Sequence, residues 1–170
     1  MNAPLTIEDL MSQALAMERE AVARYQELAD IMATHNNTEV AQLFREMAGY
    51  EQHHVDHILA DMGWADDVIA PRNSTMWAMD DAPESVAFEE VHYLMHPWHA
   101  LKLALAAEQR ALAFFEQLAR NATSDSIRRA AEEMRDEEAE HVALVQTWLA
   151  KVPKPDPDWA DDPDPPRYID

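Results

Sequence analysis

Two short stretches of this chain carry the residue types of a metal site. Glu51 and His54 stand three residues apart, and Glu138 and His141 repeat that spacing further along the chain. On a helix, residues three apart share a face, so each pair can offer a carboxylate oxygen and an imidazole nitrogen to one ion. A buried carboxylate also needs a partner of this kind, because an unpaired charge is costly away from water.

A further glutamate precedes each pair, and the whole pattern occurs twice. Glu18 and its neighbours align without a gap with Glu108 and its neighbours, and the stretch around Glu51 matches that around Glu138 in the same way. The chain is therefore a duplicated helical hairpin. The six candidate metal ligands are Glu18, Glu51, His54, Glu108, Glu138 and His141.

The spacing of these residues predicts that they meet at one height. Glu18 and Glu51 lie at similar distances on either side of a polar turn at 34–38, and the second hairpin repeats this relation about a turn at 121–125. Four carboxylates and two neutral imidazoles balance the charge of two divalent metals. An oxygen-rich set with one nitrogen per metal favours iron or manganese over zinc.

The composition predicts an all-α fold that can position these residues. The chain has 170 residues, 48% of them hydrophobic, and only two glycines, which suits one helical domain. Apolar residues recur at helical spacing in four segments, the first starting near Thr6, the second ending at Gly63, the third starting at Pro97 and the fourth at Ser124 or Asp125.

These segments predict a four-helix bundle of two antiparallel hairpins. Residues 1–150 form the bundle, with a long crossover at about 63–96 that includes a short helix at about 83–94. A crossover of this length lets the second hairpin start from the far end of the bundle. Residues 151–170 are rich in Pro and Asp and form a tail.

Charge and composition exclude several classes of function. A formal net charge of -20 argues against nucleic acid and anionic membranes as partners. The absence of cysteine excludes disulfides and a rubredoxin-type iron site. The N-terminus lacks the pattern of a secretory leader, and no apolar stretch reaches membrane-spanning length, so we expect a soluble cytoplasmic protein.

The six residues in register resemble those of the ferritin-like superfamily of di-iron carboxylate proteins, closest to its rubrerythrin-like and bacterioferritin-like branches. The resemblance covers essentially all four helices and implies a ferritin-like bundle with two bound metals. It implies that Glu18 and Glu108 are terminal ligands and that Glu51 and Glu138 bridge the metals. His54 and His141 would each hold one iron.

The resemblance also bears on three neighbouring positions. Tyr25 matches a tyrosine that stands near the di-iron centre in such proteins, which makes it a candidate catalytic residue. Rubrerythrins proper have a further glutamate where this chain has Ala111, and bacterioferritin has a haem-binding methionine where this chain has Gln52. We therefore expect no haem.

Glu137 and Glu140 flank the candidate ligand Glu138 or lie beside His141, and both are expected on solvated faces of the helix rather than among the ligands.

The resemblance implies a redox protein with two Fe ions, although manganese or a mixed centre fits the same ligands. It would react with hydrogen peroxide or dioxygen as a peroxidase or a ferroxidase, with electrons from an external reductase or from Fe(II). An alternative is a non-catalytic protein that binds, buffers or senses iron. A second alternative is a di-iron hydroxylase, for which the small residues Ala14, Ala104 and Ala111 leave room. By analogy we expect a homodimer.

Overall fold

Four helices make up the part of the chain that the computed structural model describes, residues 6–66 and 96–156. Within these residues there is no strand, and the prediction of an all-α four-helix bundle is confirmed. The helices are α1 (Ile7–Thr34), α2 (Thr38–Met62), α3 (Pro97–Arg120) and α4 (Asp125–Lys151).

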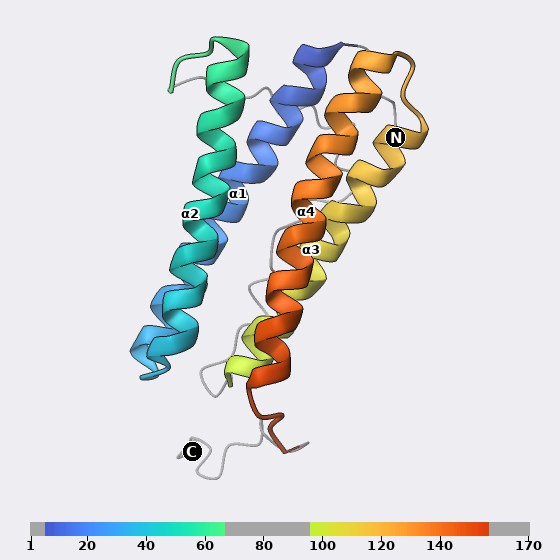
Figure 1. Ribbon diagram of the computed structural model, residues 1–170. Coiled ribbons are helices and arrows are strands. Elements are labelled where there is room, and N and C mark those ends of the chain that lie inside the picture. Colours follow the sequence, from blue (N-terminus) through green and yellow to red (C-terminus); the bar gives the residue numbers. More distant parts are fainter. Residues whose placement is uncertain (1–5, 67–95, 157–170) are drawn as a thin grey trace, which may run out of the picture.

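The helices form two antiparallel hairpins that pack side by side (Figure 1). The first hairpin is α1 and α2, and the second is α3 and α4. In Figure 1, α2 (green at its end) finishes at the top of the bundle, whereas α3 (yellow-green at its start) begins at the bottom. The two hairpins therefore start from opposite ends, as predicted. The predicted crossover, with its short helix at 83–94, falls mainly outside the described residues.

Helix ends coincide with the capping residues that the sequence indicates. The Thr6 side-chain oxygen accepts a hydrogen bond of 3.1 Å from the Asp9 backbone N–H, and that of Ser124 accepts one of 3.2 Å from Ile127. Such caps satisfy backbone donors that have no partner within the helix. Gly63 follows α2 with a φ of 65°, a left-handed conformation that glycine adopts without strain.

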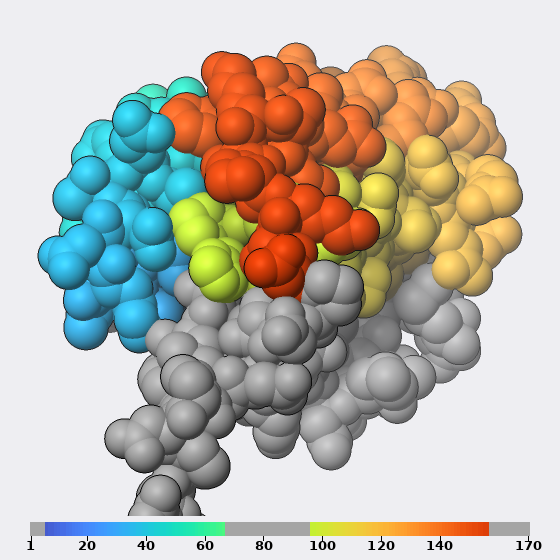
Figure 2. Space-filling view, turned by 90° about the horizontal axis from the view of Figure 1, so that it is seen from below, coloured from blue at the N-terminus to red at the C-terminus, as the bar shows by residue number. Residues whose placement is uncertain are grey.

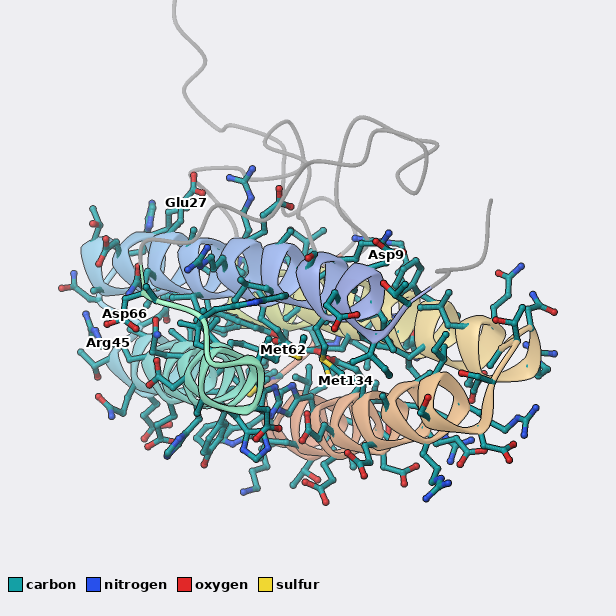
Figure 3. All side chains as sticks on the ribbon, turned by 90° about the horizontal axis from the view of Figure 1, so that it is seen from above. Asp9, Glu27, Arg45, Met62, Asp66 and Met134 are labelled. Atoms are coloured by element: carbon teal, nitrogen blue, oxygen red, sulfur yellow. The ribbon has the colours of Figure 1, made fainter. Side chains whose placement is uncertain are left out.

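Apolar side chains fill the interior in two clusters, one on each side of the six candidate ligands. Figure 3, viewed along the bundle from above, shows Met62 and Met134 directed between the hairpins, while Glu27 and Arg45 point outward. On every helix the candidate ligands separate the two clusters. Residues 25–32, 40–48, 100–107 and Val145 contribute to one cluster, and residues 10–17, 55–59, 111–119 and 127–134 to the other.

The start of the tail lies against the second hairpin. Residues 152–156 continue beyond α4 without helical structure, and the Lys154 ammonium lies 5.6 Å from the centre of the Trp98 ring. Figure 2 views this end of the bundle, with the start of α3 (yellow-green) between α4 (orange to red) and the first hairpin (blue to cyan). A cation over an aromatic face is attractive, so this contact holds the start of the tail on α3. Residues 157–170 lie outside the described part.

No helix in the described residues combines the length and the apolar character that crossing a membrane requires.

Candidate metal centre

The structure brings together all six residues that the sequence singles out. Helix α1 supplies one of them, α2 two, α3 one and α4 two. The four carboxylates are almost completely buried, with exposed fractions of 0 to 1%. Helical spacing explains this placement, because each of the six residues occupies a position on the inward apolar stripe of its helix. The six are Glu18, Glu51, His54, Glu108, Glu138 and His141.

In the first half of the site, His54 lies between two carboxylates. Its Nδ1 atom is 3.5 Å from Glu18 Oε2 and 3.4 Å from Glu51 Oε2. Glu138 completes this group, whose ligand atoms all lie within 4.8 Å of one another. Three carboxylates and one imidazole thus converge from α1, α2 and α4.

The second half repeats this arrangement around His141. Its Nδ1 atom lies 2.9 Å from Glu51 Oε1, 3.6 Å from Glu108 Oε2 and 3.8 Å from Glu138 Oε2. Glu51 therefore approaches an imidazole of each half through a different oxygen, and Glu138 also belongs to the donor groups of both halves. This is the placement that a bridging carboxylate requires.

The two imidazole rings stack on each other. The centres of the His54 and His141 rings are 5.1 Å apart and their planes differ by 6°. Each ring turns its Nδ1 atom toward the carboxylates. The donor set is therefore nearly symmetric about the middle of the bundle.

Many polar atoms of the cluster lack hydrogen bonds of acceptable geometry. They include both carboxylate oxygens of Glu18 and of Glu51, Glu108 Oε2, and the Nδ1 atoms of both histidines. Buried polar groups in proteins are normally hydrogen-bonded, and unpaired ones cost free energy. Two divalent cations would use these atoms as ligands and balance the carboxylate charge, so the residues fit a dinuclear metal site.

In the metal-free protein, interactions among the glutamate and histidine side chains of the cluster shift their pKa values. Burial, and the charge of Glu51, raise the pKa of Glu18 well above its ordinary value. Burial acts in the same direction on Glu108, but the nearby His141 and Glu138 side chains and the hydrogen bond from Tyr25 outweigh it and lower the pKa of that carboxyl.

Both imidazoles hold their protons more tightly than usual. Burial lowers the pKa of His141, but the carboxylates of Glu108 and Glu51 outweigh burial and raise it to about 11. The pKa of His54 is also raised, because Glu18 and Glu137 outweigh burial. Metal ions bind the neutral imidazole, so metal and protons compete for these ligands.

Tyr25 lies beside the second half of the cluster. It is 5% exposed, and its hydroxyl donates a short hydrogen bond to Glu108 Oε1. Its ring stacks on Phe44 with the ring centres 5.9 Å apart. The bond fixes the orientation of the Glu108 carboxylate, a role that its counterpart in the repeat, Phe115, cannot fill.

Replacing Tyr25 by Phe should lower the free energy of unfolding of the metal-free protein by about 1.5–3 kcal/mol, because the bond is to a charged group. Chemical denaturation measures this value. The matched control is Tyr50→Phe at a 45% exposed position, which should change stability by about 0.5 kcal/mol or less. Equal effects of the two substitutions would show that the Tyr25 hydroxyl has no special contact.

Glu137 is a residue whose contact the sequence interpretation missed. Its side chain is 42% exposed and so partly solvated, as expected, but its Oε2 atom also lies 3.5 Å from His54 Nε2. Its spacing is only a partial signal: Glu137 precedes His141 by four residues and so lies on the same side of α4, but spacing does not show which residue of α2 it faces. Glu140, by contrast, is exposed as expected.

Comparisons with known proteins agree with this geometry. The family model described as Rubrerythrin matches residues 9–98. The crystal structure of an uncharacterized conserved protein from Magnetospirillum magnetotacticum MS-1 is 33% identical, with a TM-score of 0.74, and the match covers 89% of this chain and 98% of that chain. No curated protein gives a significant match. The structural match extends over both hairpins, whereas the family model ends at the start of α3.

Proposed function

This chain belongs to the rubrerythrin family, and we propose that its buried cluster binds two iron ions and that the protein is an oxidoreductase whose oxidant is hydrogen peroxide or dioxygen. The observation that supports the proposal is the convergence of four buried carboxylates and two imidazoles, in which Glu51 and Glu138 belong to both halves. When bound, iron would supply two electrons from two Fe(II) ions, enough to reduce one hydrogen peroxide to two waters with the uptake of two protons.

The residues of the chain would each have a defined task. Glu18 and His54 would hold one metal, Glu108 and His141 the other, and the two shared glutamates would bridge them. The apolar clusters on both sides of the site limit the access of water. In such surroundings the electrostatic interactions between ligand and metal are stronger than in water.

The electrons that restore the Fe(II) state would come from outside the chain. The sequence has no cysteine, so it carries no rubredoxin-type donor of its own. A separate reductase, or Fe(II) itself, would supply two electrons per cycle. The residues suggested for a hydroxylase pocket, Ala14, Ala104 and Ala111, lie buried in the packed interior, and no observation favours that activity.

The proposal predicts about two irons per chain in protein purified without oxygen. The Fe(II) form is then mixed with hydrogen peroxide and, separately, with dioxygen, while ferric absorbance is followed. Faster oxidation by peroxide would identify a peroxidase, and faster oxidation by dioxygen a ferroxidase. Sustained peroxide consumption with an added reductant would exclude simple iron buffering.

Two variants make this experiment decisive. Glu51→Ala removes a carboxylate shared by both halves and should abolish binding of at least one metal. Glu140→Ala removes an exposed carboxylate from α4 and should leave metal content unchanged. If the wild type holds no more iron than Glu51→Ala, the cluster is a buried polar network and the proposal is wrong.

A further inference from the structure

Besides Tyr25 and Phe115, the two halves of the site differ at a second pair of equivalent positions. Tyr50 directly precedes the shared glutamate of the first half, and Glu137 directly precedes that of the second. Each lies against the imidazole of the other half. The Tyr50 ring stacks on His141 with centres 6.3 Å apart and planes 28° apart, whereas Glu137 Oε2 lies 3.5 Å from His54 Nε2. The duplication therefore places an aromatic ring over one histidine and a carboxylate over the other.

Exposure falls stepwise from solvent to the interior on the Glu137 side. The side chains of Glu137, His54 and Glu18 are 42%, 17% and 0% exposed. The two nitrogens of His54 face opposite ways along this line, since Nε2 approaches Glu137 and Nδ1 approaches Glu18 at 3.5 Å each. The other imidazole, His141, has a side chain that is only 8% exposed.

From this geometry we propose that Glu137 and His54 form the port through which divalent metal ions reach and leave the buried site, and that Tyr50 closes the equivalent path over His141. The inference rests on the proposed metal-binding function and adds the route by which metal ions enter and leave the site. A half-exposed carboxylate can bind a cation that still keeps most of its water. Rotation of the His54 ring about its side-chain torsions then brings a nitrogen from Glu137 toward the carboxylates.

Tyr50 offers nothing comparable on the other side. It has no carboxylate, and its ring covers the imidazole with an apolar face. A hydrated cation at that position would lose water without gaining a charged ligand, which is unfavourable. Exchange of metal is therefore expected through the His54 half of the site.

The test uses cobalt(II), whose absorbance reports binding, and a chelator that removes it. In Glu137→Gln, which keeps the side-chain shape but not the charge, uptake and release should both slow about tenfold. The dissociation constant should change by less than about threefold, because both rates fall together. Glu140→Gln removes the same charge from an exposed position on α4 and should exchange cobalt at the wild-type rate.

The equivalent position provides a gain-of-function variant. Tyr50→Glu places a carboxylate against His141 and should accelerate cobalt uptake, whereas Tyr50→Phe keeps the ring and should not. A dissociation constant weakened about 10–100-fold in Glu137→Gln, with faster release, would mean that Glu137 only orients His54 as a ligand. That result overturns the port.

Three other results would also overturn it. Equal rates in Glu137→Gln and Glu140→Gln would show that only general charge matters. Normal cobalt binding with unchanged uptake and release rates in all variants would show that Glu137 and His54 are not the port, but the proposed metal site would stand. No cobalt binding by the wild type would overturn the proposed function itself, together with the route.

Discussion

Saturating the protein with divalent metal is expected to raise its free energy of unfolding by about 4 kcal/mol at a free metal concentration of about 1,000 times the dissociation constant. For a chain of this size that corresponds to an increase in Tm of roughly 8–16 °C. The physical reason is that the metal-free site keeps buried carboxylate oxygens without hydrogen bonds, and metal binding satisfies them only in the folded state. Calorimetry with and without metal measures the change.

Two equivalent glutamates should respond in opposite directions when metal is absent. Glu18→Leu removes a carboxyl whose oxygens lack hydrogen bonds and whose pKa is raised. Because its neighbour His54 keeps the carboxylates of Glu51 and Glu137 nearby, the substitution should stabilise the metal-free protein by about 1–4 kcal/mol. Glu108→Leu removes the partner of Tyr25 and of His141. It should destabilise the metal-free protein by about 3–5 kcal/mol, because both partners stay buried.

Both variants should lose much of the metal-induced increase in Tm, since each lacks one ligand. Comparing the two variants with and without metal separates the free-energy cost of burying a carboxylate from the stability that the carboxylate contributes by binding metal. If Glu18→Leu destabilises the metal-free protein as much as Glu108→Leu does, the two halves are equally well satisfied without metal. The explanation of the stability increase would then be wrong.

The sequence was sufficient for the parts of the site that depend on a single helix. Glu51 and His54 are inward because they lie on one apolar stripe, and the caps at Thr6 and Gly63 set the limits of the hairpin. The repeat then supplied the second half of the ligand set. Periodicity within a helix and the internal repeat therefore predicted the fold class and predicted that these six residues lie close together.

The contacts of Glu137 and Tyr50 could not be predicted in this way. Each joins α2 of the first hairpin to α4 of the second, and this pairing depends on how the two hairpins are aligned along the bundle axis. A helical repeat fixes which side of its own helix a residue occupies, but not which residue faces it across a hairpin boundary. Tyr50 and Glu137 occupy equivalent positions in the repeat, but one is an aromatic residue and the other a carboxylate.

Metal affinity should increase steeply with pH between about 6 and 8. Without metal the pKa of His141 is raised to about 11, so its imidazole carries a proton at neutral pH that a metal must displace. The raised pKa of Glu18 adds to this competition. Each proton released contributes a factor of about ten in the dissociation constant per pH unit.

The stability of the metal-free protein should follow the opposite trend. A folded-state pKa of about 11 lies above the ordinary value of 6.5 for His141. Its stabilising contribution is thus fully present below pH 6.5 and is lost as the pH rises toward 11. The raised pKa of Glu18 acts in the same direction above pH 4.5.

Titration calorimetry in two buffers of different ionisation enthalpy counts the protons released on cobalt(II) binding. At least about one proton per protein is expected at pH 7, from the His141 imidazole. Affinity that does not change between pH 6 and 8 would mean that His141 is already neutral without metal. Because alkaline conditions weaken the metal-free fold while they strengthen metal binding, the metal-induced increase in Tm should grow with pH, which links the site's chemistry to the stability of the bundle.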